Sequence, residues 1–396
     1  MPIETQNKII NLSKVTIYFL LFGFAGIIII YFSLGWLTTT TPFGIRLFFD
    51  NYDINVYYKS SAWVAGGGKL YQEVYSEYLI LANLIFGLLR FLAEIFQPLS
   101  NSKLSFIWLW MSASLCLYLW IIYQVYTKSS KILNLTLWIW LAPATFYFTL
   151  YRFDIYPAVI TFLALFFLQK DKHYQGAFWL GIAIALKGYM LFVLPVYFIF
   201  LYSQKGWQEA VKIISLCLLP FLLSNFAVFA YSGWIEMMKP YVNQSNRFLN
   251  PESTYKALIY LSHFKLSWID KIPNFRKITQ LLQISTALIV VLLRPKTFEA
   301  LVNSFLFVVL GFMSFSIFYS PQFLLWIAPI IYFCNSRQLN FLMIALAWIT
   351  FLDFPILADL QEHYPVFIVL FQIIVILITF IRFAMMYILY NVIIGN

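Results

Sequence analysis

The sequence predicts an all-α, polytopic integral membrane protein, and its composition and hydropathy pattern carry that prediction. Hydrophobic residues make up 62% of the 396 residues and charged residues only 11%, which excludes an ordinary soluble domain. Apolar runs of about 20 residues, the length of a membrane-spanning helix, recur as far as the C-terminus. The alternating pattern of a membrane β-barrel is absent from these runs. We therefore expect residues 1–396 to form a single integral membrane domain.

The apolar runs predict about twelve transmembrane helices. The first run follows Lys8 and Lys14, is too long for a signal peptide and has no cleavage site of small residues after it, so we interpret it as a retained anchor. Several other runs are shorter than about 20 residues, which indicates tilted or broken spans. The predicted spans cover residues 15–37, 104–126, 132–150, 155–169, 175–188, 189–203, 210–231, 278–293, 297–318, 322–335, 338–355 and 364–386.

The orientation of the spans depends on the segment 78–100, which is apolar enough to cross but contains Arg90, Glu94 and Gln97. If this segment lies along the membrane surface, the short basic loops fall on the same side as the N-terminal lysines, as the positive-inside rule requires. These loops are residues 128–131, 169–173, 204–207, 294–296 and 335–337. We therefore predict cytoplasmic N- and C-termini, and interfacial helices within a first extracytoplasmic loop over residues 38–103.

This topology gathers the remaining polar segments on the extracytoplasmic face. They include residues 151–154, Lys187, a second long loop over residues 232–277, and residues 319–322. The net charge of +10 is carried by loops, where topology and anionic lipid explain it better than nucleic acid does. We therefore expect the lipid bilayer, and no nucleic acid, as a partner of this chain.

A group of carboxylates marks the first of these loops. Asp50, Asp53, Glu73 and Glu77 all lie within residues 48–78, although the whole chain has only 16 acidic residues. Ionisable groups beside hydrocarbon are costly, so such a cluster indicates a functional site. Asp53 opens a segment with helical spacing of apolar residues, where it would serve as a helix cap, as a catalytic group, or as both. Glu77 begins the interfacial segment, where an acid also suits the helix dipole.

Cationic residues on the same face are candidates for binding a phosphate. Arg152 lies beside the bilayer, where its guanidinium suits a phosphate headgroup, although pairing with Asp154 at the membrane edge is the alternative. Lys187 ends an apolar run, a position where lysine side chains commonly reach the interface. Arg247 lies in the basic second loop, and Gln322 begins a span at a position that favours the protein interior. No residues have the spacing of metal ligands, so we predict no cofactor and no obligatory metal.

Four segments of the chain carry a resemblance to a known family, namely residues 53–71 with Glu77 and Tyr78 following, residues 151–157, residues 181–190 and residues 319–326. In their order and spacing they resemble the GT-C superfamily, whose members are polytopic glycosyltransferases that use a polyprenyl-phosphate donor on the extracytoplasmic face. The likeness is closest to the bacterial alpha-mannosyltransferase-like branch. Members of the family often have two prolines where this chain has Leu79 and Ile80.

The resemblance implies a glycosyltransferase that moves a hexose, with mannose as the first candidate, from a polyprenyl phosphate to an acceptor hydroxyl. It implies an acid of the first loop as catalytic base, which matches Asp53, and an attack opposite the phosphate would invert the anomeric configuration. Arg152, Lys187 and Arg247 would stabilise the departing phosphate. The other residues expected to contact the substrates are Tyr57, Glu77, Tyr78, Asp154 and Gln322. The acceptor is a glycan, a lipid or a protein, and the short loops favour the bacterial inner membrane.

Two other classes of function stay open on the sequence alone. A lipid or small-solute transporter, or flippase, also has charged residues around a cavity and spans broken by proline, as at Pro195, Pro220 and Pro329. A transporter should carry its polar site near the bilayer midplane between paired repeats, whereas the candidate groups here cluster at span ends. The other class is a non-catalytic subunit of a complex that assembles the cell envelope.

Overall fold

The computed structural model describes residues 50–95, 102–127 and 135–395, and in these ranges the chain folds into helices and connecting turns. The only pairing of extended backbone within them is an isolated bridge between Leu70 and Val74. The predicted all-α class is therefore confirmed for the described part of the chain. The predicted anchor over residues 15–37 lies outside the described residues.

Six helices in the described ranges are long and apolar enough to cross a membrane. They are α5 (Ser102–Thr127), α11 (Trp207–Ser232), α14 (Phe275–Leu293), α15 (Phe298–Phe315), the run Arg337–Glu362 that contains α17 (Arg337–Phe351) and most of α18 (Ala358–His363), and the run Pro365–Gly395 that contains α19 (Ile368–Gly395). These helices support the predicted integral membrane protein.

The prediction of twelve spans is not confirmed, because several predicted spans form helices that are short or strongly bent. The predicted span 132–150 contains α6 (Leu135–Trp140) and α7 (Pro143–Tyr151), and residues 155–169 form α8 (Ile155–Leu168). Helices α7 and α8 meet at a bend of 112°. Three further predicted spans form helices of 14, 12 and 11 residues, namely α9 (His173–Leu186), α10 (Leu194–Lys205) and α16 (Leu324–Cys334). By length and composition, the described residues contain six spans, or seven if the bent pair is one span.

The breaks between helices have local causes in the sequence. Gly206 and Gly233 have positive φ angles of 79° and 96°, which side chains other than glycine rarely adopt, and they separate α10, α11 and α12 (Trp234–Ser245). Thr297 and Ser336 begin α15 and α17, because their side chains accept hydrogen bonds from backbone N–H groups of the first helical turn.

The buried core lies where α8, α9, α11, α15 and α16 pack together. Two glycines let neighbouring helices approach closely. A Cβ at Gly181 of α9 would lie 2.1 Å from the backbone oxygen of Cys217 in α11. A Cβ at Gly311 of α15 would lie 2.4 Å from the side chain of Thr286, so α14 is held tightly against the buried α15.

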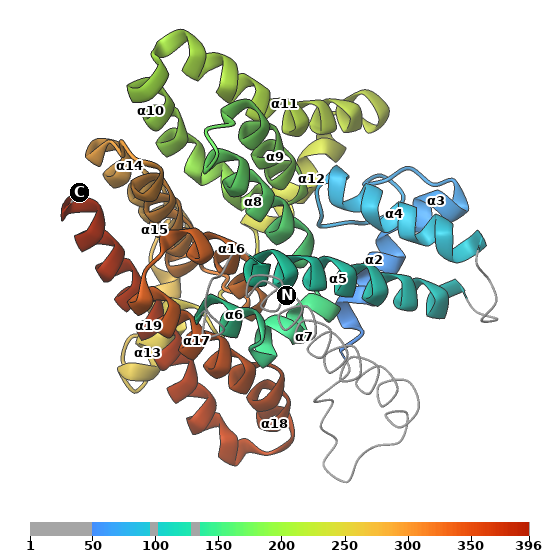
Figure 1. Cartoon of the computed structure of the whole chain (residues 1–396). Helices are drawn as coiled ribbons and strands as arrows, with labels where there is room; N and C mark the ends of the chain where they lie inside the picture. Colours follow the sequence, from blue (N-terminus) through green and yellow to red (C-terminus); the bar gives the residue numbers. More distant parts are fainter. Residues whose placement is uncertain (1–49, 96–101, 128–134, 396) are drawn as a thin grey trace, which may run out of the picture.

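The first loop forms helices at one side of the molecule. Figure 1 shows α2 (Tyr52–Ser60), α3 (Ala62–Gly66) and α4 (Ile80–Ile95) gathered next to α5 and away from α17, α18 and α19. Leu88 on α4 is 58% exposed, while Arg90 and Glu94 on the same helix pair at 2.6 Å. An open apolar surface with a polar edge is typical of a helix that lies along a membrane surface.

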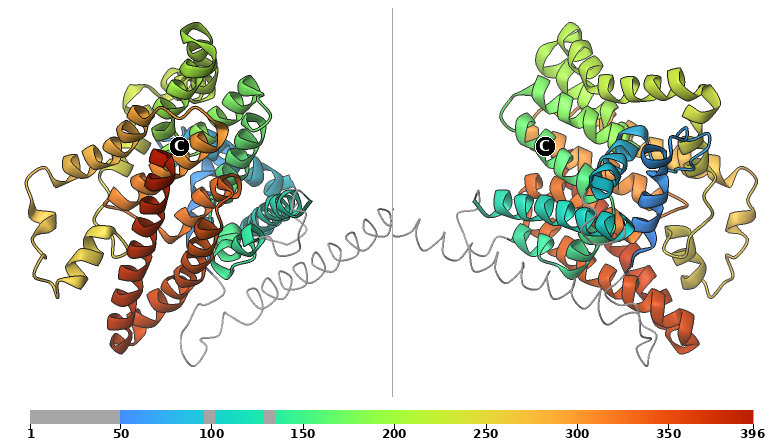
Figure 2. Two further views of the ribbon diagram at one scale, coloured as in Figure 1. Left: turned by 60° about the vertical axis from the view of Figure 1, so that its left-hand side comes forward. Right: turned by 90° about the vertical axis from the view of Figure 1, so that its right-hand side faces the viewer.

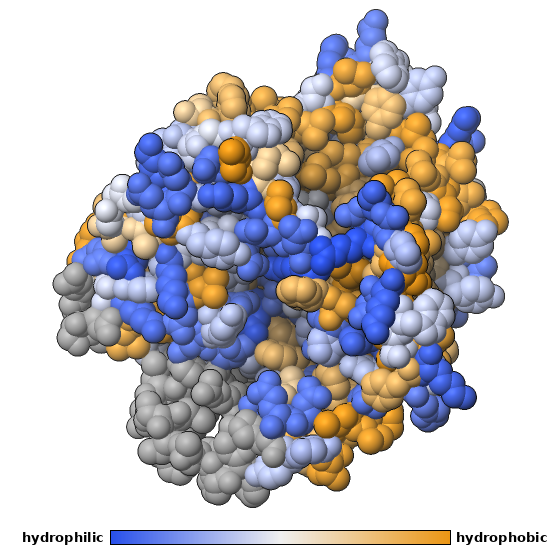
Figure 3. All heavy atoms as spheres, turned by 180° about the vertical axis from the view of Figure 1, so that it is seen from behind, coloured by the Kyte–Doolittle hydropathy of each residue, from blue (hydrophilic) through white to orange (hydrophobic). Residues whose placement is uncertain are grey.

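The second long loop, predicted over residues 232–277, contains α12, α13 (Thr254–Leu261) and a 3-10 turn at Ile269–Lys271. Figure 2 shows this yellow segment at the edge of the molecule in both of its views. Figure 3 shows a face on which hydrophilic residues gather across the centre, with hydrophobic residues around them. A polar centre within an apolar surface is where a site that faces both water and lipid would lie.

The predicted topology makes a direct prediction for cysteine labelling. In a variant with the native cysteines replaced by alanine, Gln72→Cys in the first loop should react with an impermeant maleimide added to intact cells. Lys172→Cys, in the turn between α8 and α9, should react only after the cells are permeabilised. Both native side chains are exposed, so access by the reagent depends on the side of the membrane. Labelling of Lys172→Cys from outside would contradict the predicted orientation.

Candidate active site

The corner between α7 and α8 brings Arg152 to the start of α2. The Nε atom of its buried guanidinium lies 3.2 Å from Oδ2 of Asp53, and Nη2 donates a hydrogen bond to Oδ2 of Asp50. The guanidinium also lies over the ring of Phe354, 5.4 Å from its centroid. Because a buried charge is costly unless it is paired, the two acids of the first loop hold Arg152 in place.

Tyr57 ties α2 to the same corner. Tyr57 lies one helical turn after Asp53, and its hydroxyl donates a hydrogen bond of 3.4 Å to Oδ2 of that carboxylate. The same hydroxyl accepts a hydrogen bond of 3.0 Å from the backbone N–H of Phe153. The tyrosine ring is fully buried between Phe86 and Trp110, with ring centroids 4.6 Å away on each side. The position of Asp53 is therefore set by α2, α4, α5 and the corner together.

Asp53 is a carboxylate whose pKa is shifted by its surroundings. Burial raises its pKa above the ordinary value of 3.8, Arg152 opposes that rise, and the nearby charges of Asp50 and Asp154 add to it. One fifth of the side chain is still exposed. A carboxylate with a raised pKa accepts a proton more readily than an exposed aspartate does.

Asp154, at the same corner, has different partners. Its side chain is fully buried, and Oδ1 lies 2.5 Å from Nζ of Lys187 and accepts a hydrogen bond from the indole N–H of Trp326. The other oxygen, Oδ2, is buried without a hydrogen-bond partner among the described residues. Arg152 therefore pairs with the first loop, whereas Asp154 pairs with Lys187, in place of the Arg152–Asp154 pair considered as the alternative.

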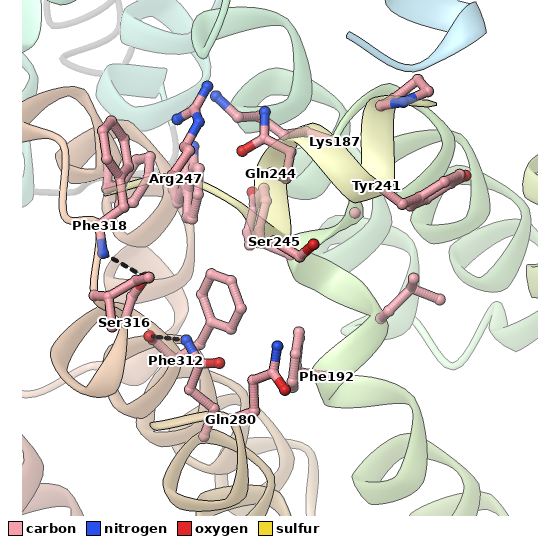
Figure 4. Close-up of a pocket in the computed structure, with 18 of the residues that line it drawn as sticks. Lys187, Phe192, Tyr241, Gln244, Ser245, Arg247, Gln280, Phe312, Ser316 and Phe318 are labelled. Atoms are coloured by element: carbon pink, nitrogen blue, oxygen red, sulfur yellow. Dashed lines mark hydrogen bonds between the residues drawn. The ribbon is translucent and has the colours of Figure 1, made fainter. Parts of the chain in front are cut away.

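A cavity of about 530 Å³ lies beside this corner, and three cationic side chains line it. Lys187 comes from the turn after α9, Arg247 from the segment after α12, and Arg276 from the first turn of α14. Figure 4 shows Lys187, Arg247 and Gln244 close together at one end, with Phe192, Phe312 and Gln280 further along the cavity. Arg247 is held by Glu77 at 2.6 Å and lies over the ring of Phe318, 4.3 Å from its centroid.

Stacked aromatic rings form one wall of the cavity. Trp326 stacks on Tyr189 at 4.2 Å and on Phe323 at 3.7 Å, and Nζ of Lys187 lies 5.0 Å from the Trp326 ring centroid. Because Trp326 also donates to Asp154, the wall and the Lys187 ammonium are fixed by the same carboxylate.

The predicted site residues fall into two adjoining groups. Lys187, Arg247, Glu77, Tyr78 and Gln322 line the cavity, whereas Asp53, Tyr57, Arg152 and Asp154 are absent from its lining and form the corner. The two groups meet at Tyr78, whose ring packs edge-on against Tyr57 at 5.3 Å. Arg152, predicted to contact the donor phosphate, is instead occupied by two carboxylates.

Several cavity residues were not predicted as site residues from the sequence, among them Arg276, Gln280, Gln283 and Trp326. The first three are spaced i, i+4 and i+7 at the start of α14, a pattern that places them on one face of the helix. Trp326 ends the segment 319–326 that contributes to the family resemblance, but it was not predicted as a site residue. In the described ranges, no group of three or more His, Cys, Asp or Glu side chains is arranged to hold a metal ion.

Removal of Lys187 should destabilise the protein, because it leaves the Asp154 carboxylate buried without its cation. Loss of one partner of a buried pair costs about 3–5 kcal/mol. We expect Lys187→Met to lower the melting temperature in detergent, and Asp154→Asn/Lys187→Met to recover part of the loss. The matched control is Lys212→Met, which breaks an exposed pair with Glu209 and should have little effect. Additive losses in the double variant would show that the two groups are not coupled.

Comparison with known proteins places the chain in a family. No curated protein matches it. The family model of Glycosyltransferase family 87 matches residues 81–321, which is more than half of the chain. The matched region contains Arg152, Asp154, Lys187 and Arg247, and begins after Asp53. The chain therefore belongs to Glycosyltransferase family 87, a family of GT-C-type polytopic membrane glycosyltransferases.

Proposed function

We propose that this glycosyltransferase moves a hexose, with mannose as the first candidate, from a polyprenyl-phosphate donor to an acceptor hydroxyl on the extracytoplasmic face, with inversion. Family membership gives the enzyme class, and the donor, the stereochemistry and the catalytic base are our proposal. The observation that carries it is the cavity lined by cations and aromatic rings, which adjoins a carboxylate cluster through Tyr78. Both parts of such a reaction, a phosphate site and a base, then lie next to each other.

The cationic end of the cavity suits the phosphate. A polyprenyl-phosphate sugar carries one negative charge, and the polyprenyl phosphate that departs gains a second when the bond to the anomeric carbon breaks. Lys187 and Arg247 stabilise that growing charge, with Arg276 as a further cation at the cavity. The aromatic walls offer apolar surface to the first isoprene units and keep water from the cations, which strengthens their effect.

Asp53 serves as the general base. Its carboxylate removes the proton of the acceptor hydroxyl as that oxygen attacks the anomeric carbon, opposite the bond to phosphate. In this proposal Arg152 holds Asp53 in place and limits the rise of its pKa. The cations that line the cavity, and not Arg152, then bind the phosphate. Asp154 likewise holds Lys187 in place through an ion pair, and Trp326 donates a hydrogen bond to the same carboxylate. Since cations serve the phosphate, the reaction as proposed does not require a metal ion.

The surroundings of the reaction follow from the predicted topology. The protein is an integral membrane protein, and we place it in a bacterial inner membrane with both termini in the cytoplasm. The lipid-linked donor would reach the cavity sideways from the bilayer. A glycan, a lipid or a protein would present its hydroxyl from the extracytoplasmic side.

Replacement of the base tests the proposal directly. Asp53→Asn should lower kcat with a polyprenyl-phosphate hexose by roughly 10²- to 10⁴-fold, the usual contribution of general-base catalysis. Asp50→Asn is the matched control, because Asp50 contacts the same guanidinium but is not the proposed base. Initial rates of transfer, with melting temperatures for each variant, provide the measurement. Full turnover by a folded Asp53→Asn protein would eliminate Asp53 as the base.

The dependence of the rate on pH tests the role of Arg152. Asp53 must be deprotonated to act, so kcat/KM should fall as pH decreases through a pKa above that of an ordinary aspartate. Arg152→Gln removes the charge that lowers this pKa, so the acidic limb of the profile should move to higher pH. Arg152→Lys keeps the charge and should leave the limb closer to that of the native enzyme. An acidic limb at the same pH in all three proteins would exclude this role.

A further inference from the structure

A polar face runs along the outer turns of the spanning helix α14. The helix is apolar enough to cross a membrane, yet Arg276, Thr279, Gln280 and Gln283 all line the cavity. Their spacing of i, i+3, i+4 and i+7 places them on one side of the helix, over a length of about 10 Å. Away from this face α14 carries mostly apolar side chains, such as Leu281, which is 66% exposed, although Lys277 and Ser285 are polar.

The amides of this face have unused hydrogen-bonding capacity. Within the part of the chain that the structure describes, the side chain of Gln280 has no hydrogen-bond partner, and Figure 4 shows it pointing into the cavity. Gln283 donates from Nε2 to the backbone oxygen of Phe312 at 3.1 Å, which leaves its own oxygen as an acceptor. Gln244 of α12 lines the cavity without a partner among the described residues. Gln280 and Gln244 are both exposed at the cavity, so a ligand with hydrogen-bonding groups can reach their amides.

Arg276 connects the start of this face to the end of α12. Arg276 donates from Nη1 to the backbone oxygen of Ser245 at 3.3 Å and to Oδ1 of Asn246 at 3.2 Å. These contacts tie the start of α14 to the end of α12, so Gln280 and Gln244 are held on two sides of one space. Ile284, next on the same face, is apolar, and the polar stretch therefore ends two turns into the helix.

We propose that the polar face of α14, with Gln244 opposite, is a subsite for sugar hydroxyls. The inference rests on the proposed function, because it divides the same cavity into a phosphate end and a sugar end. A hydroxyl both donates and accepts hydrogen bonds, as an amide does, and each amide can therefore serve one or two hydroxyls. An isoprenoid chain in the same place would bury the amides unpaired, which is unfavourable, and a phosphate is better served by Lys187 and Arg247.

The sugar has two possible sources, the hexose of the donor or a saccharide acceptor. The key variant is Gln280→Met, which keeps the length of the side chain and removes the amide. Gln280→Asn keeps the amide but shortens its reach, and Gln208→Met, at an exposed position at the start of α11, is the matched control. Purified full-length proteins in lipid nanodiscs are titrated with polyprenyl phosphate, with polyprenyl-phosphate mannose and glucose, and with an alkyl mannoside.

For Gln280→Met we expect the affinity for a sugar-bearing probe to fall roughly 3- to 10-fold, the range for lost hydrogen bonds between uncharged groups. The affinity for sugar-free polyprenyl phosphate should stay unchanged, and Gln280→Asn should lie between Gln280→Met and the native protein. A loss confined to the polyprenyl-phosphate hexoses identifies the donor sugar. A loss confined to the alkyl mannoside, measured with polyprenyl phosphate already bound, identifies a saccharide acceptor.

Three results would overturn the inference. They are an equal loss of affinity for sugar-free polyprenyl phosphate, no loss for any probe, and a native protein that binds none of the sugar probes. The same measurements distinguish a failure of the subsite from a failure of the proposed glycosyl transfer. A native protein whose sugar binding depends on Gln280 but which transfers no hexose from polyprenyl phosphate would retain the subsite and remove the proposed donor. Normal transfer with unchanged donor and acceptor KM in Gln280→Met would retain the reaction and remove the subsite.

Discussion

The candidate site depends on the pairing of charges at the corner between α7 and α8. Arg152 and Asp154 stand two residues apart and reach different partners, the acids at the start of α2 and the Lys187–Trp326 pair. Each of these charges is withdrawn from water, and its desolvation is offset only while its partner stays in place. The sharp bend between the two helices therefore links the first loop, the end of α9 and the start of α16 at one point.

The same pairing decides which charged side chains line the cavity. The partner of Lys187 lies behind the lining, and Glu77 is the only carboxylate that lines the cavity in the described ranges. Three cations therefore face the space against one acid, which attracts an anion. Aromatic rings around them reduce access by water, so a phosphate held there would experience a stronger field than on an exposed surface. The pairing of charges at the corner therefore both positions the cations and favours an anionic ligand.

The helical class and the membrane location could be predicted because both follow from composition, and hydropathy located the six long apolar helices. The number of spans could not be predicted, because hydropathy measures the length of an apolar run and not the continuity of a helix. Residues 132–150 were predicted as one span, yet residues 135–150 form two helices, α6 (Leu135–Trp140) and α7, with a break before Pro143. A short helix such as α8 or α9 is buried by its neighbours, so its apolar side chains need no lipid.

Charged residues near apolar runs are conspicuous in the sequence, which is why Asp53, Lys187 and Arg247 could be selected before their positions were known. Their partners could not be selected, since Arg152 pairs with Asp50 across 102 residues of chain while Asp154 lies two residues away. The glutamines of α14 escaped notice for a different reason. A hydropathy average includes all residues of a helix, whichever side of the helix they lie on. A polar face on an apolar helix therefore becomes visible only when the residues are arranged by their angle around the helix axis. Polar residues that share one face of a span require a polar neighbour, and α14 has that neighbour in the cavity.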